Sequence, residues 1–239
     1  MNRFGYAAGG VRQRTRATPE VVNAFMRGVY AWMSGGLAIT ALVAWYGAQS
    51  QFVMQNILGS GVGLIGLVIG QFALVIVLSA AVHKLAPAMA SGLFLLYSGM
   101  MGLLLATIFY VYPMGDIFKA FITTAGMFGA MSVYGLTTKK DLTSWGSFLM
   151  MGLFGIIIAM VVNIFLQSAA MDFVISGIGV VVFTGLTAYD TQQLRVMGDV
   201  APDDQAAVQR ATINGALRLY LDFINLFIML LSLFSGGRE

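Results

Sequence analysis

The chain has 239 residues, of which 59% are hydrophobic and only 10% are charged, and it contains no cysteine. Soluble domains have about 45–50% apolar and about 25% charged residues, so this composition excludes a cytosolic enzyme. The missing cysteines exclude disulfides and thiolate metal sites, and one histidine, His83, is too few for the common zinc sites. With a net charge of only +3, we expect no nucleic-acid partner and no bound cofactor.

Residues 1–27 form a polar, arginine-bearing segment without the apolar run and cleavage site of a secretory signal. We predict that this segment is a mobile cytoplasmic tail. The remainder of the chain, residues 28–239, is predicted to be one membrane domain.

Long uncharged stretches follow the tail, and the first of them runs from Arg27 to Lys84. A helix crosses the hydrocarbon core with about 20 apolar residues. The sequence lacks the repeated strand-period alternation of a membrane barrel, so helices must satisfy the backbone. We therefore predict an all-α, polytopic bundle of seven transmembrane helices: Gly28–Gln49, Val62–Val82, Pro87–Tyr110, Ile117–Thr137, Thr143–Leu166, Phe173–Leu194 and Leu217–Phe234.

Basic residues are unequally divided between the two sides of this arrangement. Lysine and arginine are enriched in cytoplasmic loops, and ten basic residues fall on the side of the N-terminus, against Lys119 and Arg238 on the other. This predicts a cytoplasmic N-terminus and an external C-terminus. The longest connection, Arg195–Ala216, is expected to be a solvated cytoplasmic loop whose acids do not match a calcium-binding loop.

Small residues recur at helical spacing in several spans, as at Gly59, Gly63, Gly66 and Gly70. Such residues let helix backbones approach closely in lipid. Close packing is the favoured interpretation, and a glycine-lined pore is the alternative.

Two acids in the last two spans are the most informative residues. Asp190 lies about one turn inside the boundary marked by Arg195, and Asp222 lies about one turn inside the boundary marked by Arg218. The two carboxyls therefore share a depth, and an ionisable group inside the membrane is a functional-site hypothesis by default. Two facing carboxyls do not readily both ionise, so the pair is a candidate gate or pH sensor.

Polar residues at helical spacing accompany each acid. Arg218 and Asn225 lie on the helix of Asp222, and Thr187 lies on the helix of Asp190. We expect Arg218 to be a local counter-charge and Asn225 and Thr187 to support the pair. In a purely structural alternative, Arg218 pairs with Asp222 along its own helix and threonines satisfy Asp190.

Three segments carry a resemblance to a known family. They read YGLTTKKDL from Tyr134, GLTAYDTQ from Gly185 and LYLDFINLF from Leu219. With these segments the chain resembles the Bax inhibitor-1 family of seven-helix membrane proteins, in particular its bacterial inner-membrane members. The resemblance covers essentially the whole chain after the tail.

The resemblance implies a calcium-leak channel gated by a pH-sensitive aspartate pair, matched here by Asp190 and Asp222. It also implies a lipid bilayer, calcium and protons as partners, and for some bacterial relatives a membrane-anchored protease. Some members carry an acid in the second span, where this chain has Gln71, and a second-span arginine has no match beyond His83 and Lys84. Any metal ligands therefore stay unassigned.

Other functional classes use the same acids. A non-conducting regulatory protein in stress response, or a modulator of a membrane-anchored protease, is the main alternative, and a small-solute transporter is another. An intramembrane aspartyl protease is the remote alternative. Tyr189 and Asp190 fit the first half of its motif, but Leu219 and Leu221 stand where glycines are expected around Asp222. We therefore expect no catalytic residues.

Overall fold

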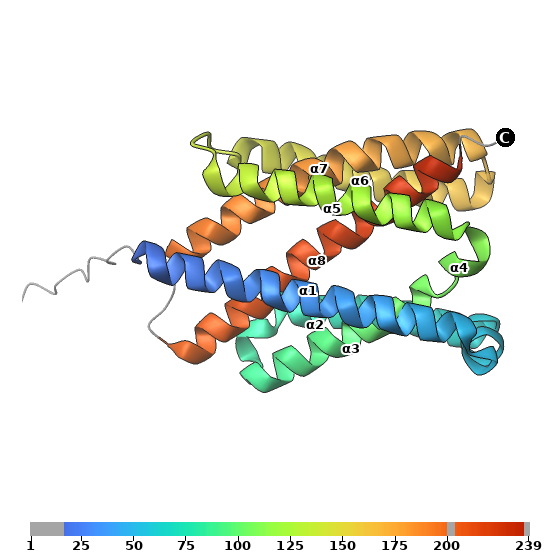
Figure 1. The fold of residues 1–239 in the computed structure, drawn as a ribbon, viewed down its shortest axis with the longest axis horizontal. Helices are drawn as coiled ribbons and strands as arrows, with labels where there is room; N and C mark the ends of the chain where they lie inside the picture. The colour runs from blue at the N-terminus through green and yellow to red at the C-terminus, as the bar shows by residue number, and fades with distance from the viewer. Residues whose placement is uncertain (1–16, 200–203, 237–239) are drawn as a thin grey trace, which may run out of the picture.

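The computed structural model describes residues 17–199 and 204–236, and these form helices without a strand. Seven of the helical segments are long and apolar enough to cross a membrane, with α3 and α4 together making one of them. This confirms the predicted all-α, seven-span fold. In chain order the helices are α1 (Pro19–Gln49), α2 (Gly61–Ala80), α3 (Pro87–Leu105), α4 (Ile108–Val111), α5 (Met114–Thr137), α6 (Thr143–Leu166), α7 (Ala169–Asp199) and α8 (Gln205–Ser235) (Figure 1).

Local signals begin and end these helices. Proline occupies the first helical position of α1 and α3, where its missing N–H costs no hydrogen bond. Ser60 caps α2 by accepting a hydrogen bond from the backbone N of Gly63 at 3.1 Å, and Asp204 caps α8 by accepting from Ala206 N at 3.0 Å. The tight turn between α6 and α7 contains Gln167 in the left-handed region, with φ of 50°.

The helices form two groups of three around a central helix. The helices α1, α2 and α3 pack together on one side of α8, and α5, α6 and α7 on the other (Figure 1). In the most apolar stretch of α8, 61% of the residues are buried, against 17% to 33% in the other six spans. A residue on α8 therefore faces protein on nearly every side, which makes this helix the natural place for a buried polar site.

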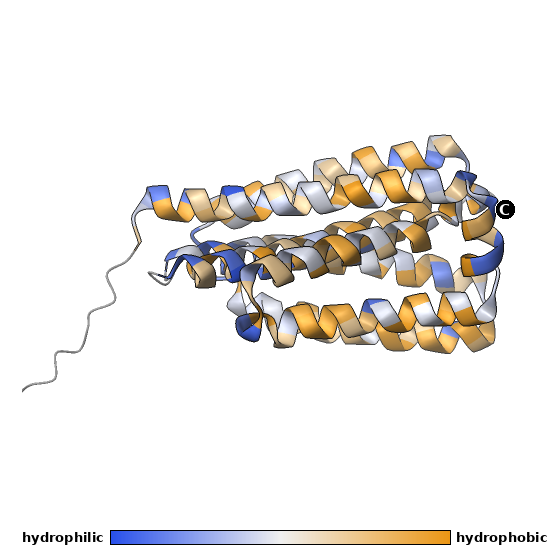
Figure 2. Cartoon of the chain, turned by 90° about the horizontal axis from the view of Figure 1, so that it is seen from below, coloured by the Kyte–Doolittle hydropathy of each residue, from blue (hydrophilic) through white to orange (hydrophobic). Residues whose placement is uncertain are grey.

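The hydropathy of the ribbon agrees with a bilayer environment. Apolar residues dominate the helices, and hydrophilic ones are concentrated near their ends (Figure 2). Many large apolar side chains point outward, for example Phe165 at 83% and Val181 at 70% exposure. An exposed apolar surface of this extent requires a hydrocarbon solvent.

Two predicted boundaries are wrong. The first helix begins at Pro19 and not at Gly28, and α8 begins at Gln205, so most of the predicted Arg195–Ala216 loop is helical. These ends pack on one another, with Gly198 against Phe25 and Gly28 against Thr212. Charges mark where a helix leaves the hydrocarbon, but the helix itself continues. Of the predicted tail, residues 1–16 lie outside the described residues.

Glycines allow close helix crossings at some positions. A Cβ on Gly102 of α3 would lie 2.7 Å from the carbonyl oxygen of Thr40 in α1, and one on Gly135 of α5 would collide with the carbonyl oxygen of Ala188 in α7. The predicted glycine series is only partly used for close packing. A Cβ on Gly70 would contact Met100, whereas a Cβ on Gly66 would have no neighbouring atom within 4 Å.

Candidate functional site

The two predicted acids meet at the interface of α7 and α8. Asp222 lies near the middle of α8 and is only 5% exposed, and Asp190 lies in the last third of α7 and is half-buried. Their carboxyl groups are within hydrogen-bonding reach of each other. Two residues that are far apart in sequence thus form one carboxyl pair between α7 and α8.

A hydrogen bond between these two carboxyls requires a proton on one of them. Oδ2 of Asp222 is buried and receives no hydrogen bond from a donor among the described residues. A carboxylate only accepts hydrogen bonds, so Asp222 and Asp190 can bond to each other only when one of them is protonated. The two acids therefore titrate as a unit and not as independent groups.

Arg218 lies one turn before Asp222 on α8, and its side chain is exposed. The ion pair expected in the purely structural alternative is not formed: within residues 17–199 and 204–236 the ion pair present is Arg210–Asp204, at 3.6 Å. Arg218 nevertheless exerts a Coulombic effect on both Asp190 and Asp222. It is a nearby charge and not a direct partner.

Thr187 and Asn225 were expected to support the pair, but their hydrogen bonds are local. Thr187 Oγ1 donates to the carbonyl oxygen of Phe183 at 2.8 Å, and Asn225 Nδ2 donates to that of Leu221 at 2.8 Å. Each side chain thus has its hydrogen-bond acceptor in the backbone of its own helix. The structure brings Asp190, Asp222 and Arg218 together and leaves these two residues without a hydrogen bond to the acids.

The three sequence segments behind the resemblance converge on this region. Gln192, two residues after Asp190, accepts a hydrogen bond from the backbone N of Leu142 at 2.9 Å and donates one to the carbonyl oxygen of Lys140 at 2.8 Å. Arg195 donates to the carbonyl oxygen of Leu136 at the end of α5. The loop between α5 and α6 is therefore fastened to α7 beside the acid pair.

A second polar cluster, which the sequence analysis did not find, lies on the opposite side of α8. Tyr220 is fully buried, and its hydroxyl is 2.6 Å from Oγ1 of Thr40 in α1. Thr40 Oγ1 also lies 2.9 Å from the carbonyl oxygen of Ser98 in α3 and 3.0 Å from that of Gly36. The one available signal was a threonine within an apolar span, which is too common to single out.

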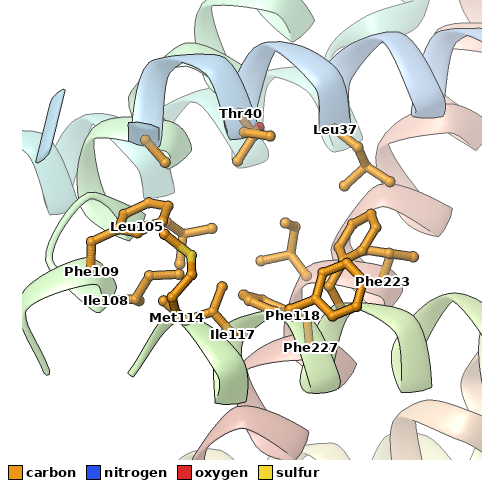
Figure 3. Close-up of a pocket in the computed structure, with 14 residues that line it drawn as sticks. Leu37, Thr40, Leu105, Ile108, Phe109, Met114, Ile117, Phe118, Phe223 and Phe227 are labelled. Atoms are coloured by element: carbon orange, nitrogen blue, oxygen red, sulfur yellow. The ribbon is translucent and has the colours of Figure 1, made fainter. Parts of the chain in front are cut away.

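An apolar cavity of about 290 Å³ adjoins this cluster. Leu37 and Thr40 of α1 point into it from one side, Ile117 and Phe118 of α5 from the other, and Phe223 closes it along α8 (Figure 3). Thr40 is the one polar residue among its lining side chains, so in this conformation the cavity presents hydrocarbon where a cation would need oxygen ligands.

Beyond the pair, acidic side chains are dispersed. In the part of the chain that the structure describes, no three acids or histidines gather at one point. Gln71, which replaces a second-span acid, is buried and donates weakly to the carbonyl oxygen of Tyr97 at 3.5 Å. Asp116, in the first turn of α5, is also buried, so the described bundle holds a further acid apart from this two-carboxyl site.

Comparison with known proteins agrees with these observations. The sequence profile described as "Inhibitor of apoptosis-promoting Bax1" matches residues 22–239. The chain is 51% identical over 218 residues to the inner membrane protein YbhL of Escherichia coli, covering 91% of this chain and 93% of YbhL.

Other bacteria have similar proteins at lower identity. An uncharacterized protein of Borreliella burgdorferi is 44% identical over 219 residues, covering 92% of this chain and 94% of the relative. One of Deinococcus radiodurans is 42% identical over 216 residues, covering 90% and 92%. The chain is therefore a multi-pass inner-membrane protein, and it belongs to the Bax inhibitor family.

Proposed function

We propose that this protein is a pH-sensitive leak pathway for cations, calcium foremost, and that the Asp190–Asp222 pair is its gate. The observation that carries the proposal is the contact between two carboxyls at the centre of a membrane bundle. An acid there is costly and is rarely retained without a function. Changing the proton count of this pair changes the charge buried between α7 and α8.

The chemistry of the pair suits a permeant ion better than a resident one. Calcium takes six to eight oxygen ligands, with carboxylates foremost, and the pair supplies two carboxyls. A conducting site must bind weakly enough to release the ion again. Asp190 and Asp222 are therefore proposed to attract and pass a divalent cation that keeps most of its water.

The apolar cavity is proposed to be the second element of the gate. Hydrophobic constrictions close a pore because water withdraws from them. Phe223 follows Asp222 directly in α8, and its ring stands at the cavity wall with its centroid 5.9 Å from that of Phe121 in α5. We infer that the described conformation is non-conducting and that conduction requires water to enter this space.

A flux measurement tests the proposal. Liposomes containing only the purified full chain and an entrapped calcium dye are diluted into calcium at values from about pH 5 to pH 8. We expect entry above that of empty liposomes and a steep dependence on pH. Asp199→Asn, at the end of α7, is the matched control, and it should keep both the calcium entry and its steep dependence on pH.

A protein without flux at any pH supports the second candidate, a non-conducting regulatory protein of the membrane. The observation that favours this candidate is the apolar lining of the cavity. Cleavage of a membrane-spanning peptide would instead indicate a protease, against which the bulky Leu219 and Leu221 argue, since they flank the acid where substrate backbone must approach.

The orientation is part of the proposal, because it sets which side of the membrane each end of the bundle faces. Basic residues at the end that carries Lys84, Lys139 and Lys140 favour a cytoplasmic location for that end. A reporter fused between residues 140 and 141, or within 200–203, should then be cytoplasmic, and one after residue 239 should be external. A cytoplasmic C-terminus would contradict this orientation.

A further inference from the structure

A cleft that neither Asp190 nor Asp222 lines opens at the end of the bundle that bears the loop between α5 and α6. It consists of two adjoining cavities, one of about 310 Å³ and one of about 440 Å³, and Lys140 and Asp141 line both. The first is walled by α5 and α6 with α7 as its floor, and the second lies between the loop and the end of α7. One continuous depression therefore passes from the lipid-facing side of the bundle to its polar end.

The first cavity is mainly apolar. Met131 and Leu149 line its walls, and Gly185 and Ala188 form its floor on α7. Tyr134, 41% exposed, and Trp145, 62% exposed, stand at its rim. Tyrosine and tryptophan are enriched where hydrocarbon meets water, so this rim is at the level of the membrane interface.

The second cavity is polar and carries an excess of positive charge. Lys139, Lys140 and Arg195 line it, against two acids, Asp141 and Asp199. Asp141 already has a partner in Thr143, whose backbone N donates to its carboxylate at 2.9 Å. Hydrogen bonding from the side chain and then from the backbone of Thr143 lowers the pKa of Asp141 below its usual range.

The side chains of the two lysines, by contrast, are not paired with an acid. Lys139 and Lys140 are exposed, and neither makes an ion pair within residues 17–199 and 204–236. The backbone that presents them is fixed, since Gln192 holds both the carbonyl oxygen of Lys140 and the backbone N of Leu142. Two unpaired ammonium groups are thus held at the mouth of an apolar cleft.

We propose that this cleft binds one molecule of an anionic phospholipid, with an acyl chain between α5 and α6 and the phosphate beside Lys139 and Lys140. The occupant follows from the surroundings: the apolar part faces the bilayer, the aromatic rim lies at the interface, and basic pockets between membrane helices at that level bind anionic headgroups. Neither Asp190 nor Asp222 lines the cleft, so lipid binding there does not depend on whether the protein conducts ions.

Lipid binding to the purified full chain tests this site. The protein is delipidated in detergent and titrated with phosphatidylglycerol or with phosphatidylcholine of the same acyl chains, and bound lipid is counted by native mass spectrometry. We expect one tightly held phosphatidylglycerol and weaker phosphatidylcholine. Because each basic residue near an anionic headgroup contributes about a fivefold gain in affinity, Lys139→Gln with Lys140→Gln should weaken phosphatidylglycerol binding about thirtyfold and leave phosphatidylcholine unchanged.

Matched variants separate the two parts of the cleft. Lys84→Gln removes an exposed lysine at the same end of the bundle but outside the cleft, and should leave lipid binding unchanged. Met131→Trp fills the apolar cavity and should weaken both lipids. Glycerol phosphate, which offers the phosphate without an acyl chain, should not compete.

Three results overturn the proposal. They are equal binding of both lipids by the unmodified chain, an equal loss in Lys84→Gln and in the double lysine variant, and displacement of lipid by glycerol phosphate. The lysines lie on the surface, so the double variant is expected to fold, and its thermal unfolding midpoint without lipid checks that it does.

Discussion

The central helix α8 carries two polar sites that differ in every respect except depth. Tyr220 and Asp222 are two residues apart, which places them about 200° apart around the helix. Tyr220 faces α1 and α3, where its hydroxyl meets Thr40 at 2.6 Å, and Asp222 faces α7, where its carboxyl meets that of Asp190. One site is neutral and fully hydrogen-bonded, whereas the other needs a proton to be satisfied.

This contrast assigns different mechanical roles to the two sides of the bundle. The rings of Phe94 and Tyr97 pack edge-on against Tyr220, with centroids 5.8 and 5.7 Å away. Complete hydrogen bonding and close aromatic packing fix α8 to the α1–α3 group at every pH. The acid pair joins α8 to α7 only while a proton is shared. We therefore expect α8 to stay with α1–α3 when the pair ionises and the α5–α7 group to shift relative to them.

The largest expected effect comes from removing the charge change. Asp190→Asn and Asp222→Asn keep the size of the side chain but abolish its ionisation, so each should eliminate the steep pH dependence of flux. The double variant should resemble either single one, because groups that act as a unit give non-additive effects. Calcium flux titrations of the unmodified chain, both singles and the double measure this.

Independent structural acids would behave differently. Their losses would add, and the pH response would survive in each single variant. Additive losses with an intact response would remove the pair from the mechanism. Asp199→Asn controls for the loss of one negative charge on α7.

The sequence predicted the acid pair and the seven spans for a common physical reason. Charge is costly in hydrocarbon, so uncharged runs reveal the spans and a charge within a run reveals a site. The distribution of charges does not show where a helix ends outside the hydrocarbon. Glu20 and Arg210 lie in segments that were predicted to be a tail and a loop, and both segments are helical. The contact between Tyr220 and Thr40 was also out of reach, because it depends on which helix faces which.

The second-largest expected effect is a loss of stability of the fold. Thr40→Val removes the hydroxyl that joins α1, α3 and α8 and leaves the buried hydroxyl of Tyr220 without its partner. Such an unsatisfied group costs about 1–3 kcal/mol, so thermal unfolding in detergent should shift to lower temperature while the pH midpoint of flux is unchanged.

The matched control for Thr40 is a buried threonine with only a local bond. Thr124 is fully buried in α5 and donates to the carbonyl oxygen of Ala120 within its own helix. Thr124→Val should therefore cost much less than Thr40→Val. Equal losses would show that the bond between Thr40 and Tyr220 contributes nothing beyond packing.

Arg218→Ala should shift the pH response without abolishing it. The positive charge favours the ionised pair, so its removal lets the acids keep their proton to higher pH, and the midpoint of flux should rise. Arg218 is exposed and not in direct contact with either acid, and such charges contribute about 1 kcal/mol or less. Since one pH unit corresponds to about 1.4 kcal/mol, the shift should be less than about one unit.

Arg210→Ala is the control for this shift. Arg210 also lies on α8, but its guanidinium is engaged by Asp204 at 3.6 Å and donates to the carbonyl oxygen of Leu85 at 3.4 Å. Its loss should leave the midpoint unchanged. An equal rise in both variants would show that general positive charge, and not the position of Arg218, sets the response.

The smallest effect is expected for Thr187→Val, next to the acid pair on α7. Its hydroxyl bonds to the carbonyl oxygen of Phe183, which also belongs to the helix backbone, and valine has nearly the same shape. We expect a loss of stability of about 1 kcal/mol or less and an unchanged pH midpoint of flux. Thr187 is fully buried within one turn of Asp190, so a hydroxyl that rotated toward the acid during gating would stabilise one charge state. A midpoint shift in Thr187→Val would reveal that rotation, and would restore Thr187 to the support role that its position in the sequence predicted.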